Sequence, residues 1–377
     1  MITGIGAVAG LGHGTETIWL GLLAGKRGTQ RVTQFVECGL DVGPIALVPG
    51  LPLSVPNRAT LLALDAVREA LTDAGDVPRG PRLGVTLGTT LGGITNFLGA
   101  VRQESFAPRW GYAGPVYAVA TEVGARGPLE VTSTACGSGN VALGVARDLI
   151  LEGRCDVVLA GGVDALHDFV VSGFASLKAL DPEPSRPFDR TRRGLNLGEG
   201  ASFLVVENEA HAKARGARIR AVLSGYGLSA DAVHMTGPDR QGRGAVRGMQ
   251  SALASAGRHP DEVDFVSLHG TATLFNDLME SKAMAAVFGA RAGVVPANSV
   301  KSALGHTLGA AGALEAMVCV RVLETGLIPP TVGLTELDPE ISLNVVHGSA
   351  LQTDVRIALS TASGFGGTNA AIVLERA

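Results

Sequence analysis

Short runs of β-branched residues alternate with longer stretches rich in alanine and leucine along the chain. The short runs predict strands and the longer stretches predict helices. The strands that we expect are Leu83–Leu87, Val157–Ala160, Ser202–Glu207 and Phe265–Leu268, and the helices are Ser138–Leu151 and Ala310–Leu323. Because strands alternate with helices and the joints are rich in glycine, we expect an α/β protein with mainly parallel sheets covered by helices.

A weak internal repeat suggests that the fold is duplicated. The segment GEGASFLVVE, which ends at Glu207, resembles GGTNAAIVLE, which ends at Glu375, in its glycine entry and in its apolar run. We expect each segment to form the last strand of one half of the molecule.

The composition narrows the classes of protein to be considered. Of the 377 residues, 46% are hydrophobic and 18% are charged, which is enough apolar material for a large core and too little charge for a disordered chain. The net charge of −4 provides no overall attraction to nucleic acid. The start of the chain lacks signal-peptide features, and no apolar run reaches the ~18–20 residues of a membrane helix. We therefore expect a cytoplasmic protein with no membrane or nucleic-acid partner.

The cysteines and the first glycines exclude further classes. Cys38, Cys136, Cys155 and Cys319 are widely spaced and form no CxxC pair, so neither a disulfide framework nor a metal site is indicated. The segment GIGAVAG near the N-terminus resembles a dinucleotide-binding fingerprint, but almost no strand precedes Gly4 and no good helix follows it closely. We interpret these glycines as a structural turn.

The segment VTSTACGSGN carries the strongest candidate for chemistry. A β-branched strand ends near Ser133, and Cys136 then precedes the helix expected to run to Leu151. A cysteine at a helix N-terminus is near exposed N–H groups and the positive end of the helix dipole, which lower the thiol pKa and favour the nucleophilic thiolate. Small neighbours at Ala135 and Gly137 leave room for a substrate at the sulfur. The other three cysteines are interpreted as small buried hydrophobic residues.

Two histidines follow in glycine-rich contexts. His269, in SLHGTAT, comes directly after an expected strand, and Thr271 and Thr273 offer hydroxyl groups on alternate positions. His306, in VKSALGHTLGAAGALE, is expected to open a helix, whose dipole would keep the imidazole neutral and able to donate a hydrogen bond. Lys301 and Glu315 are expected to form a partly buried pair that holds this loop.

Near the C-terminus, SGFGGTNAA places one aromatic residue among glycines. Phe365 could act as a mobile gate, because its glycine neighbours permit large backbone rotations. It could equally be a core phenylalanine in a bulge, and the sequence leaves both interpretations open.

These motifs, in this order, resemble the elongating β-ketoacyl-acyl-carrier-protein synthases of type II fatty-acid and polyketide synthesis, members of the thiolase superfamily. The resemblance covers essentially the whole chain and rests on TACGSG, RPFDRTRRGLNLGEGA, VHMT, HGTATLFND, VKSALGHTLGAAGALE, PPT and GFGGTNAA. It implies a thiolase fold, a duplicated five-layered αβαβα architecture. Residues 1–225 would form the half with the nucleophile, and residues 226–377 the half with the two histidines.

The resemblance also implies a role for individual residues. Cys136 is the acyl-accepting nucleophile, and His269 and His306 are its two histidine partners. The supporting residues are Lys301, Glu315, Asp277 and Glu280. Phe365 matches the gating residue, whose backbone N–H shares the oxyanion hole with that of Cys136. Thr271, Thr273 and Phe174 would bind substrate, and Lys178 would meet the carrier protein, with Arg58 and Arg193 as the next candidates.

The implied reaction is a decarboxylative Claisen condensation. An acyl thioester is transferred to Cys136, and malonyl-acyl-carrier protein is decarboxylated while the histidines hold the enolate oxygen. No cofactor is expected, since the substrates are carried on the phosphopantetheine of an acyl carrier protein. The resemblance implies a dimer, either a homodimer or a heterodimer with a chain-length-factor subunit.

The sequence departs from the family pattern at three places. TACGSG replaces the commoner TACASG, HGTATLFND replaces HGTxTPxGD, and the segment between Gly92 and Tyr117 looks short. These departures leave the preferred acyl chain open, and the LFND variant is more similar to ketosynthases of polyene or other specialised pathways.

Three other classes were weighed against this interpretation. A chain-length factor resembles the family but typically lacks the cysteine. A Cys-His hydrolase needs one histidine oriented by Asn or Asp, whereas this chain offers two histidines and a helix rich in glycine and alanine. A thiolase that uses free coenzyme A would carry a second catalytic cysteine near the C-terminus, where this chain reads SGFGGTN.

Overall fold

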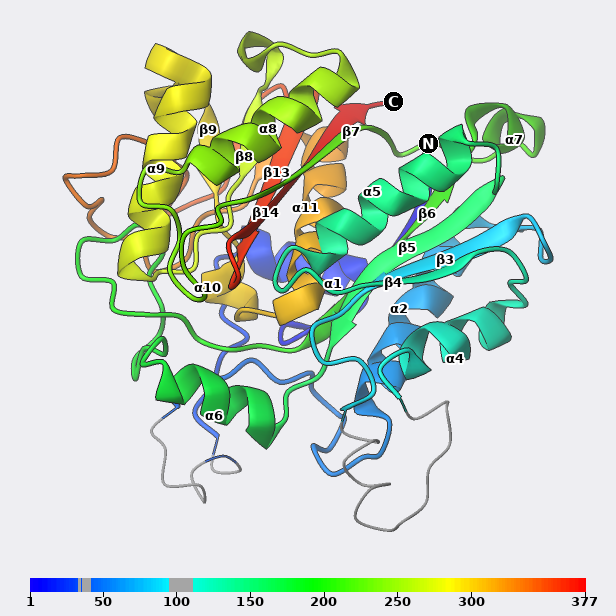
Figure 1. Ribbon diagram of the computed structural model, residues 1–377, viewed down its shortest axis with the longest axis horizontal. Helices are drawn as coiled ribbons and strands as arrows, with labels where there is room; N and C mark the ends of the chain where they lie inside the picture. The colour runs from blue at the N-terminus through cyan, green and yellow to red at the C-terminus, as the bar shows by residue number, and fades with distance from the viewer. Residues whose placement is uncertain (33–34, 36–41, 95–110) are drawn as a thin grey trace.

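Two blocks of strands with the same connectivity form the centre of the molecule (Figure 1). The computed structural model describes residues 1–32, 35, 42–94 and 111–377. The first block contains β1 (Ile2–Ala9), β3 (Leu83–Gly88), β4 (Leu129–Thr132), β5 (Val157–Asp164) and β6 (Gly200–Glu207). The second contains β7 (Ala221–Ala230), β8 (Phe265–Ser267), β9 (Pro296–Asn298), β13 (Ile357–Gly364) and β14 (Thr368–Arg376), with β11 (Asn344–Val345) at its edge.

The strand order confirms the duplication. The order is β4-β3-β5-β6-β1 in the first block and β9-β8-β13-β14-β7 in the second, and the blocks meet where Ile2 of β1 pairs with Ala221 of β7. The two segments that echo each other in sequence end in β6 and β14, which occupy equivalent positions. The expectation of mainly parallel sheets is met only in part. The β4-β3-β5 and β9-β8-β13 pairs are parallel, but β6 and β14 each run antiparallel to both of their neighbours, so the sheet is mixed.

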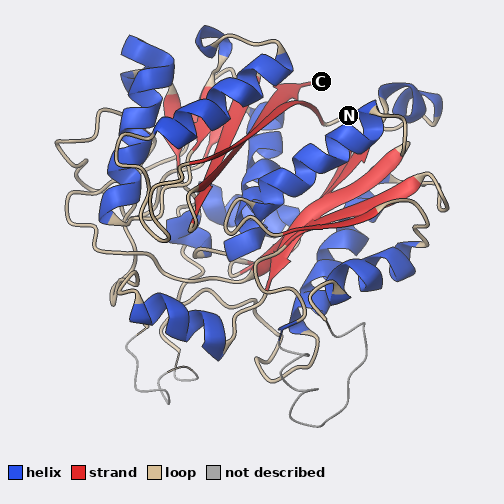
Figure 2. Cartoon of the chain, viewed as in Figure 1, coloured by secondary structure: helices blue, strands red, loops and turns tan. Residues whose placement is uncertain are grey.

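Layers of helices and layers of strands alternate, giving five layers in all (Figure 2). Helices α2 (Arg58–Ala74) and α4 (Gly114–Val123) pack on the outer face of the first block, and α8 (Arg243–Ala256) and α9 (Leu274–Phe288) lie outside the second. Helices α5 (Ser138–Leu151) and α11 (Ala311–Thr325) lie between the blocks and contact each other. This is the αβαβα arrangement expected of a thiolase fold. Three clusters of buried apolar residues lie where layers of helices and strands pack against each other.

Smaller elements complete the described part of the chain. They are β2 (Gly12–His13), α1 (Thr15–Leu23), α6 (Asp168–Ser176), α7 (Glu209–Ala214), α10 (Lys301–Leu304) and the strand pair β10 (Leu327–Ile328) and β12 (Leu351–Gln352). Among the described residues, no helix combines the length and apolar character needed to span a membrane.

Only one of the three glycines of GIGAVAG lies in the expected turn. Gly10 follows β1 in a turn, whereas Gly4 and Gly6 lie inside β1, which is paired along its length with β6. A Cβ atom at Gly4 or Gly6 would overlap the carbonyl oxygens of Ala70 and Ala66 on α2. These glycines therefore allow a helix to pack closely on a strand, which is a different use of the same residue type.

Candidate active site

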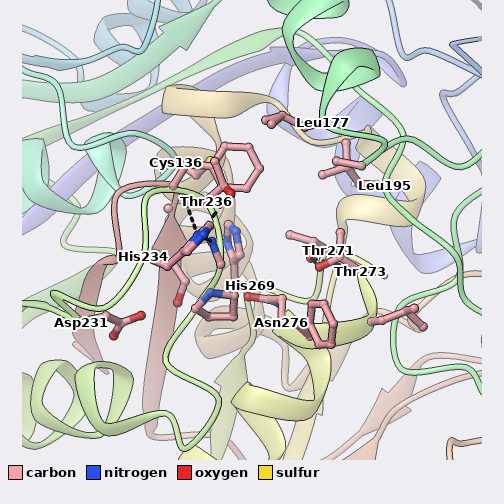
Figure 3. Close-up of a pocket in the computed structure, with 18 of the residues that line it drawn as sticks. Cys136, Leu177, Leu195, Asp231, His234, Thr236, His269, Thr271, Thr273 and Asn276 are labelled. Carbon is pink, nitrogen blue, oxygen red and sulfur yellow. Dashed lines mark hydrogen bonds between the residues drawn. The ribbon is translucent and has the colours of Figure 1, made fainter.

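Cys136, His269 and His306 come together from three separate segments of the chain. Figure 3 shows the cavity that Cys136 and His269 line. Cys136 lies between β4 and α5, His269 follows β8, and His306 lies between α10 and α11. The cysteine sulfur and one nitrogen of each imidazole lie within 4.8 Å of one another, and all three side chains are buried. They line a cavity of about 720 Å³. A sulfur and two ring nitrogens this close could act on one carbonyl group, and they could also ligate a soft divalent ion.

The turn at the cysteine has an unusual backbone. Ala135 adopts a φ of 51°, a left-handed conformation that residues with a side chain rarely adopt. The Ser138 hydroxyl stabilises the turn by donating to the Ala135 carbonyl (2.6 Å) while it accepts from the backbone N–H of Thr134 (2.9 Å). At the second residue of α5, a Cβ at Gly139 would lie 2.6 Å from the backbone nitrogen of Ala313 on α11. The small residues of both helices therefore allow the close packing that brings the two halves of the site together.

The resting thiol differs from the expected thiolate. Burial raises the pKa of Cys136 to about 12, against the opposing influence of the Lys301 ammonium. The expectation that the helix N-terminus would lower this pKa is therefore wrong, because desolvation of the anion outweighs the nearby favourable groups. At neutral pH the sulfur is protonated, and its proton must leave as the sulfur attacks.

Both histidines are neutral. Burial lowers the pKa of His269 and of His306 well below the usual value, and the Lys301 charge lowers both further. The Nδ1 atom of His306 accepts a hydrogen bond from the backbone N–H of Leu308 (3.2 Å), so the proton of the neutral ring is on Nε2. The two rings are 5.3 Å apart at an angle of 83°. Each ring can therefore donate one N–H to an oxygen atom placed between them.

His306 lies close to the expected helix start. The 3-10 helix η5 (Leu308–Ala310) begins two residues after it and leads directly into α11, and His306 itself forms a bridge with Leu197. Burial is the largest cause of its lowered pKa, followed by the Lys301 charge, and the N–H of Leu308 at the start of η5 donates to the ring.

Lys301 and Glu315 form the expected ion pair, and it is fully buried. The pair joins α10 to α11, the two helices on either side of His306. Burial raises the pKa of Glu315, while Lys301 opposes this effect. The pair holds the segment that carries His306, and it places a positive charge near both histidines and the thiol.

Asp277 and Glu280, both on α9, support the segment that carries His269. The Glu280 carboxylate accepts the backbone N–H groups of His269 and Gly270, each at 2.7 Å. Asp277 accepts the backbone N–H of Phe188 at 2.7 Å, which connects α9 to the 181–194 loop. Burial raises the pKa of Asp277 to about 6 and that of Glu280 to about 7, and the Asp277 charge raises the latter further.

The expected substrate-binding residues line the cavity. The Phe174 ring, on α6, stacks on the ring of Phe365 with centroids 5.3 Å apart and contacts His306 edge-on. The hydroxyls of Thr271 and Thr273 lie 2.9 Å apart on the cavity wall. Phe365 is 37% exposed, so it is not a core residue.

The backbone next to Phe365 is pressed against the cysteine. A Cβ at Gly364 would lie 3.0 Å from the backbone nitrogen of Cys136. The absence of a side chain at Gly364 therefore brings the two segments expected to supply the oxyanion hole next to each other.

The candidate docking residues have different environments. Lys178 is exposed at the cavity mouth, where Arg193 also lies and pairs with Asp181 at 3.0 Å. Arg58 is buried and forms a bidentate ion pair with Glu199. The suggestion that Arg58 could contact a carrier protein is therefore wrong, because its guanidinium is enclosed by the fold. Cys38 and most of the segment from Gly92 to Tyr117 lie outside the described residues.

The 231–240 loop was not predicted to be part of the site. Only its segment VHMT contributed, as one of the motifs that carry the family resemblance. This loop forms one wall of the cavity and contacts the segment around Phe365: the N–H of Asp231 donates to the Gly367 carbonyl and the N–H of Gly366 to the Met235 carbonyl, each at 2.7 Å. The Asn369 amide also donates to the Asp231 carboxylate (2.8 Å). Nothing in the spacing of the sequence indicates these contacts, because they join segments more than 130 residues apart.

A buried cysteine, two neutral histidines and a duplicated αβαβα fold define the class of thiolase-fold condensing enzymes. The chain also matches two family models, "Beta-ketoacyl synthase, N-terminal domain" over residues 55–212 and "Beta-ketoacyl synthase, C-terminal domain" over residues 220–335.

Similar proteins agree with these models over the full chain. The tetracenomycin polyketide synthase ketoacyl synthase alpha subunit of Streptomyces glaucescens is 38% identical over 100% of this chain and 96% of its own length. A 3-oxoacyl-[acyl-carrier-protein] synthase 2 of Rhizobium meliloti is 36% identical over 100% and 98%. The chain belongs to the β-ketoacyl synthase family.

Two solved structures have the same fold. One is a type II polyketide synthase acyl-carrier protein in complex with its ketosynthase bound to the hexaketide, with a TM-score of 0.95, 30% identity, and coverage of 100% of this chain and 98% of that one. The other is the ishigamide ketosynthase/chain length factor, with a TM-score of 0.91, 36% identity and the same coverage.

Proposed function

We propose that the chain catalyses decarboxylative Claisen condensation of an acyl thioester with malonyl-acyl-carrier protein, giving β-ketoacyl-acyl-carrier protein in fatty-acid or specialised polyketide synthesis. The observation that carries this proposal is the close grouping of the Cys136 sulfur with the two neutral imidazoles at a cavity of about 720 Å³. A hydrolase needs a basic histidine that activates the thiol or water, whereas two neutral N–H donors suit an enolate oxygen.

The first half-reaction transfers the acyl group. The Cys136 sulfur attacks the thioester carbonyl, a new C–S bond forms, and the carrier's thiol leaves with the proton that the cysteine loses. The backbone N–H groups of Cys136 and Phe365 hold the oxyanion. The Lys301 charge favours the transient thiolate, because it lowers the thiol pKa that burial raises.

The second half-reaction forms the carbon–carbon bond. The malonyl thioester loses CO₂, and the electron pair of the broken bond passes into an enolate whose oxygen accepts N–H groups from His269 and His306. The enolate carbon attacks the acyl carbonyl, the C–S bond to Cys136 breaks, and the sulfur regains a proton. Each positioned donor stabilises the developing charge by ~2.7–4 kcal/mol.

The expected partners follow from the resemblance to β-ketoacyl synthases. We expect substrates to arrive on the phosphopantetheine of an acyl carrier protein. This expectation is supported by a similar protein named 3-oxoacyl-[acyl-carrier-protein] synthase 2 and by a similar ketosynthase that is in complex with its acyl-carrier protein. A second subunit completes the enzyme, either another copy of this chain or a chain-length factor such as the one named with the ishigamide ketosynthase. The two halves divide near residue 225, which lies within β7.

Intact-protein mass spectrometry of the purified chain tests this function. Incubation with a panel of acyl-carrier-protein thioesters is expected to add one acyl group, and subsequent malonyl-acyl-carrier protein should remove it with release of CO₂. The same acyl groups on coenzyme A should react more slowly. Acyl transfer without carbon–carbon bond formation from any primer would contradict the proposed condensation.

Lys178→Glu is expected to raise the KM for carrier-protein substrates about tenfold and to leave small thioester mimics unaffected. Lys178 is exposed at the cavity mouth, and carrier proteins are acidic, so the reversed charge would repel them. Steady-state kinetics with both substrate types make the measurement, and Lys26→Glu is the matched control. Equal losses with both substrate types would show that Lys178 acts in the fold instead.

Phe365→Ala is expected to admit longer or unsuitable primers. The ring is partly exposed and is held by stacking on Phe174, and the flanking Gly366 and Gly367 adopt φ values of 86° and 77°. A ring in this setting can move away from the cavity when the second substrate enters. Acylation rates over a series of chain lengths make the measurement. An unchanged chain-length profile would show that Phe365 is ordinary packing.

A further inference from the structure

Asn276 lies in the site without a role assigned to it. It is the third residue of α9, its side chain is buried, and it lines the cavity beside the Thr271–Thr273 pair (Figure 3). The sequence departs from the family pattern at this point, because LFND places an asparagine where HGTxTPxGD has a glycine. A polar amide has therefore been introduced next to two buried carboxylates.

The Asn276 side chain joins these carboxylates. Its Nδ2 atom donates to Glu280 Oε2 at 2.8 Å and to Asp277 Oδ1 at 3.3 Å. The same Oε2 atom accepts the backbone N–H of Gly270, while Oε1 accepts the backbone N–H of His269, both at 2.7 Å. One amide group thus lies between the carboxylate that holds the His269 segment and the carboxylate that holds the neighbouring loop.

The electrostatic setting makes this donor important. Asp277 and Glu280 are both buried and lie one helical turn apart, so they repel each other when both are ionised. The positive groups that face them are Lys301 from α10 and Arg192 from the 181–194 loop, whose Nε lies 3.7 Å from Asp277. Arg192 also pairs with Asp338, and the nearby imidazole of His269 is neutral. The Asn276 N–H groups supplement these limited positive charges.

We propose that Asn276 is a positioning residue for His269: by donating to both Glu280 and Asp277, it holds the Glu280 carboxylate in the orientation that accepts the His269 and Gly270 N–H groups. This inference rests on the proposed function, because it assigns the role through the enolate-binding histidine. The backbone at Gly270 is held by its neighbour Ser299, whose hydroxyl donates to the Gly270 carbonyl at 2.8 Å and lies where a Cβ of residue 270 would be. Rotation of the Glu280 carboxylate would therefore be transmitted to the His269 imidazole.

Asn276→Leu tests the proposal, because it keeps the branched shape of the side chain and removes the donors. We expect decarboxylation of malonyl-acyl-carrier protein to fall about tenfold to a hundredfold, the loss expected from a small misplacement of a catalytic group. Acylation of Cys136 should change by less than about threefold, because Asn276 touches neither the sulfur nor its turn. Loss of both half-reactions together, or of neither, would overturn the proposal.

Asn276→Asp provides a readout that simple packing would not affect. The new carboxyl has the shape of the asparagine, but when ionised it only accepts hydrogen bonds and adds a third negative charge beside Glu280. When protonated at lower pH it can donate again. The ratio of variant to wild-type decarboxylation should therefore rise as the pH falls from about 8 to about 6. A pH-independent ratio near one would show that only the shape of Asn276 matters.

Two controls separate the possible failures. Thermal unfolding of both variants, with unchanged Cys136 acylation, shows that the fold is intact. Wild-type turnover in the same experiment tests the proposed function independently. If the wild-type enzyme condenses normally and both variants decarboxylate at its rate, the role of Asn276 is refuted while the proposed function stands.

Discussion

Cys136→Ala is expected to abolish condensation completely while leaving the fold unchanged. In the proposed reaction the sulfur is the atom that holds the acyl group between the two half-reactions, and no other thiol among the described residues lines the cavity. Alanine is small enough for the tight turn after Ala135. The free energy of unfolding should change by no more than the ~1 kcal/mol typical of a small buried substitution. Intact-protein mass spectrometry should detect no acylated protein.

The same variant should still decarboxylate malonyl-acyl-carrier protein. The backbone N–H of His269 donates to Glu280, and the Nδ1 atom of His306 accepts the backbone N–H of Leu308, so neither contact depends on the sulfur and both histidines should remain in place. Cys155→Ala is the matched control, because Cys155 is also buried and free but lies outside the cavity. It should keep both half-reactions. Undiminished acyl transfer in the Cys136 variant would refute the assignment of the nucleophile.

Much of the fold could be predicted from local patterns. Helix α5 has the expected bounds of Ser138–Leu151, and the internal repeat correctly identified β6 and β14 as equivalent strands. The direction of strand pairing could not be predicted, because apolar runs look alike in parallel and antiparallel sheets. The glycines of β1 were mistaken for a turn, because the α2 helix that needs their lack of side chains lies 60 residues further along the chain.

The site shows the same division between local and long-range information. The ordered motifs were enough to identify residues that the fold brings within 4.8 Å. The protonation state of Cys136 could not be predicted from the residues next to it in the sequence. The dipole argument suggested a thiolate at Cys136, but the desolvation that raises its pKa comes from residues distant in sequence. Arg58 was mistaken for a surface residue, since its partner Glu199 lies 141 residues away.

The second large effect is expected for His269→Ala and His306→Ala, which should slow decarboxylation about a hundredfold to a thousandfold each. Each substitution removes one of the two N–H donors that we propose for the enolate oxygen, and a donor of this kind is worth ~2.7–4 kcal/mol in the transition state. Both rings are neutral because burial lowers their pKa values, so each acts as a hydrogen-bond donor without a positive charge. The double variant should lose less than the product of the single effects, because the two donors share one oxygen atom.

Acylation of Cys136 should fall much less in both histidine variants. The Lys301 ammonium lowers the pKa of the thiol and so favours the thiolate, and it remains in both variants. Single-turnover measurement of each half-reaction makes the comparison, and His347→Ala, at an exposed histidine, is the control. Because burial raises the pKa of the resting thiol, the sulfur must lose a proton when it attacks, and the opposite result would identify the group that accepts it. If one histidine variant loses both half-reactions equally, that imidazole accepts the thiol proton as the sulfur attacks, and the two rings have different roles.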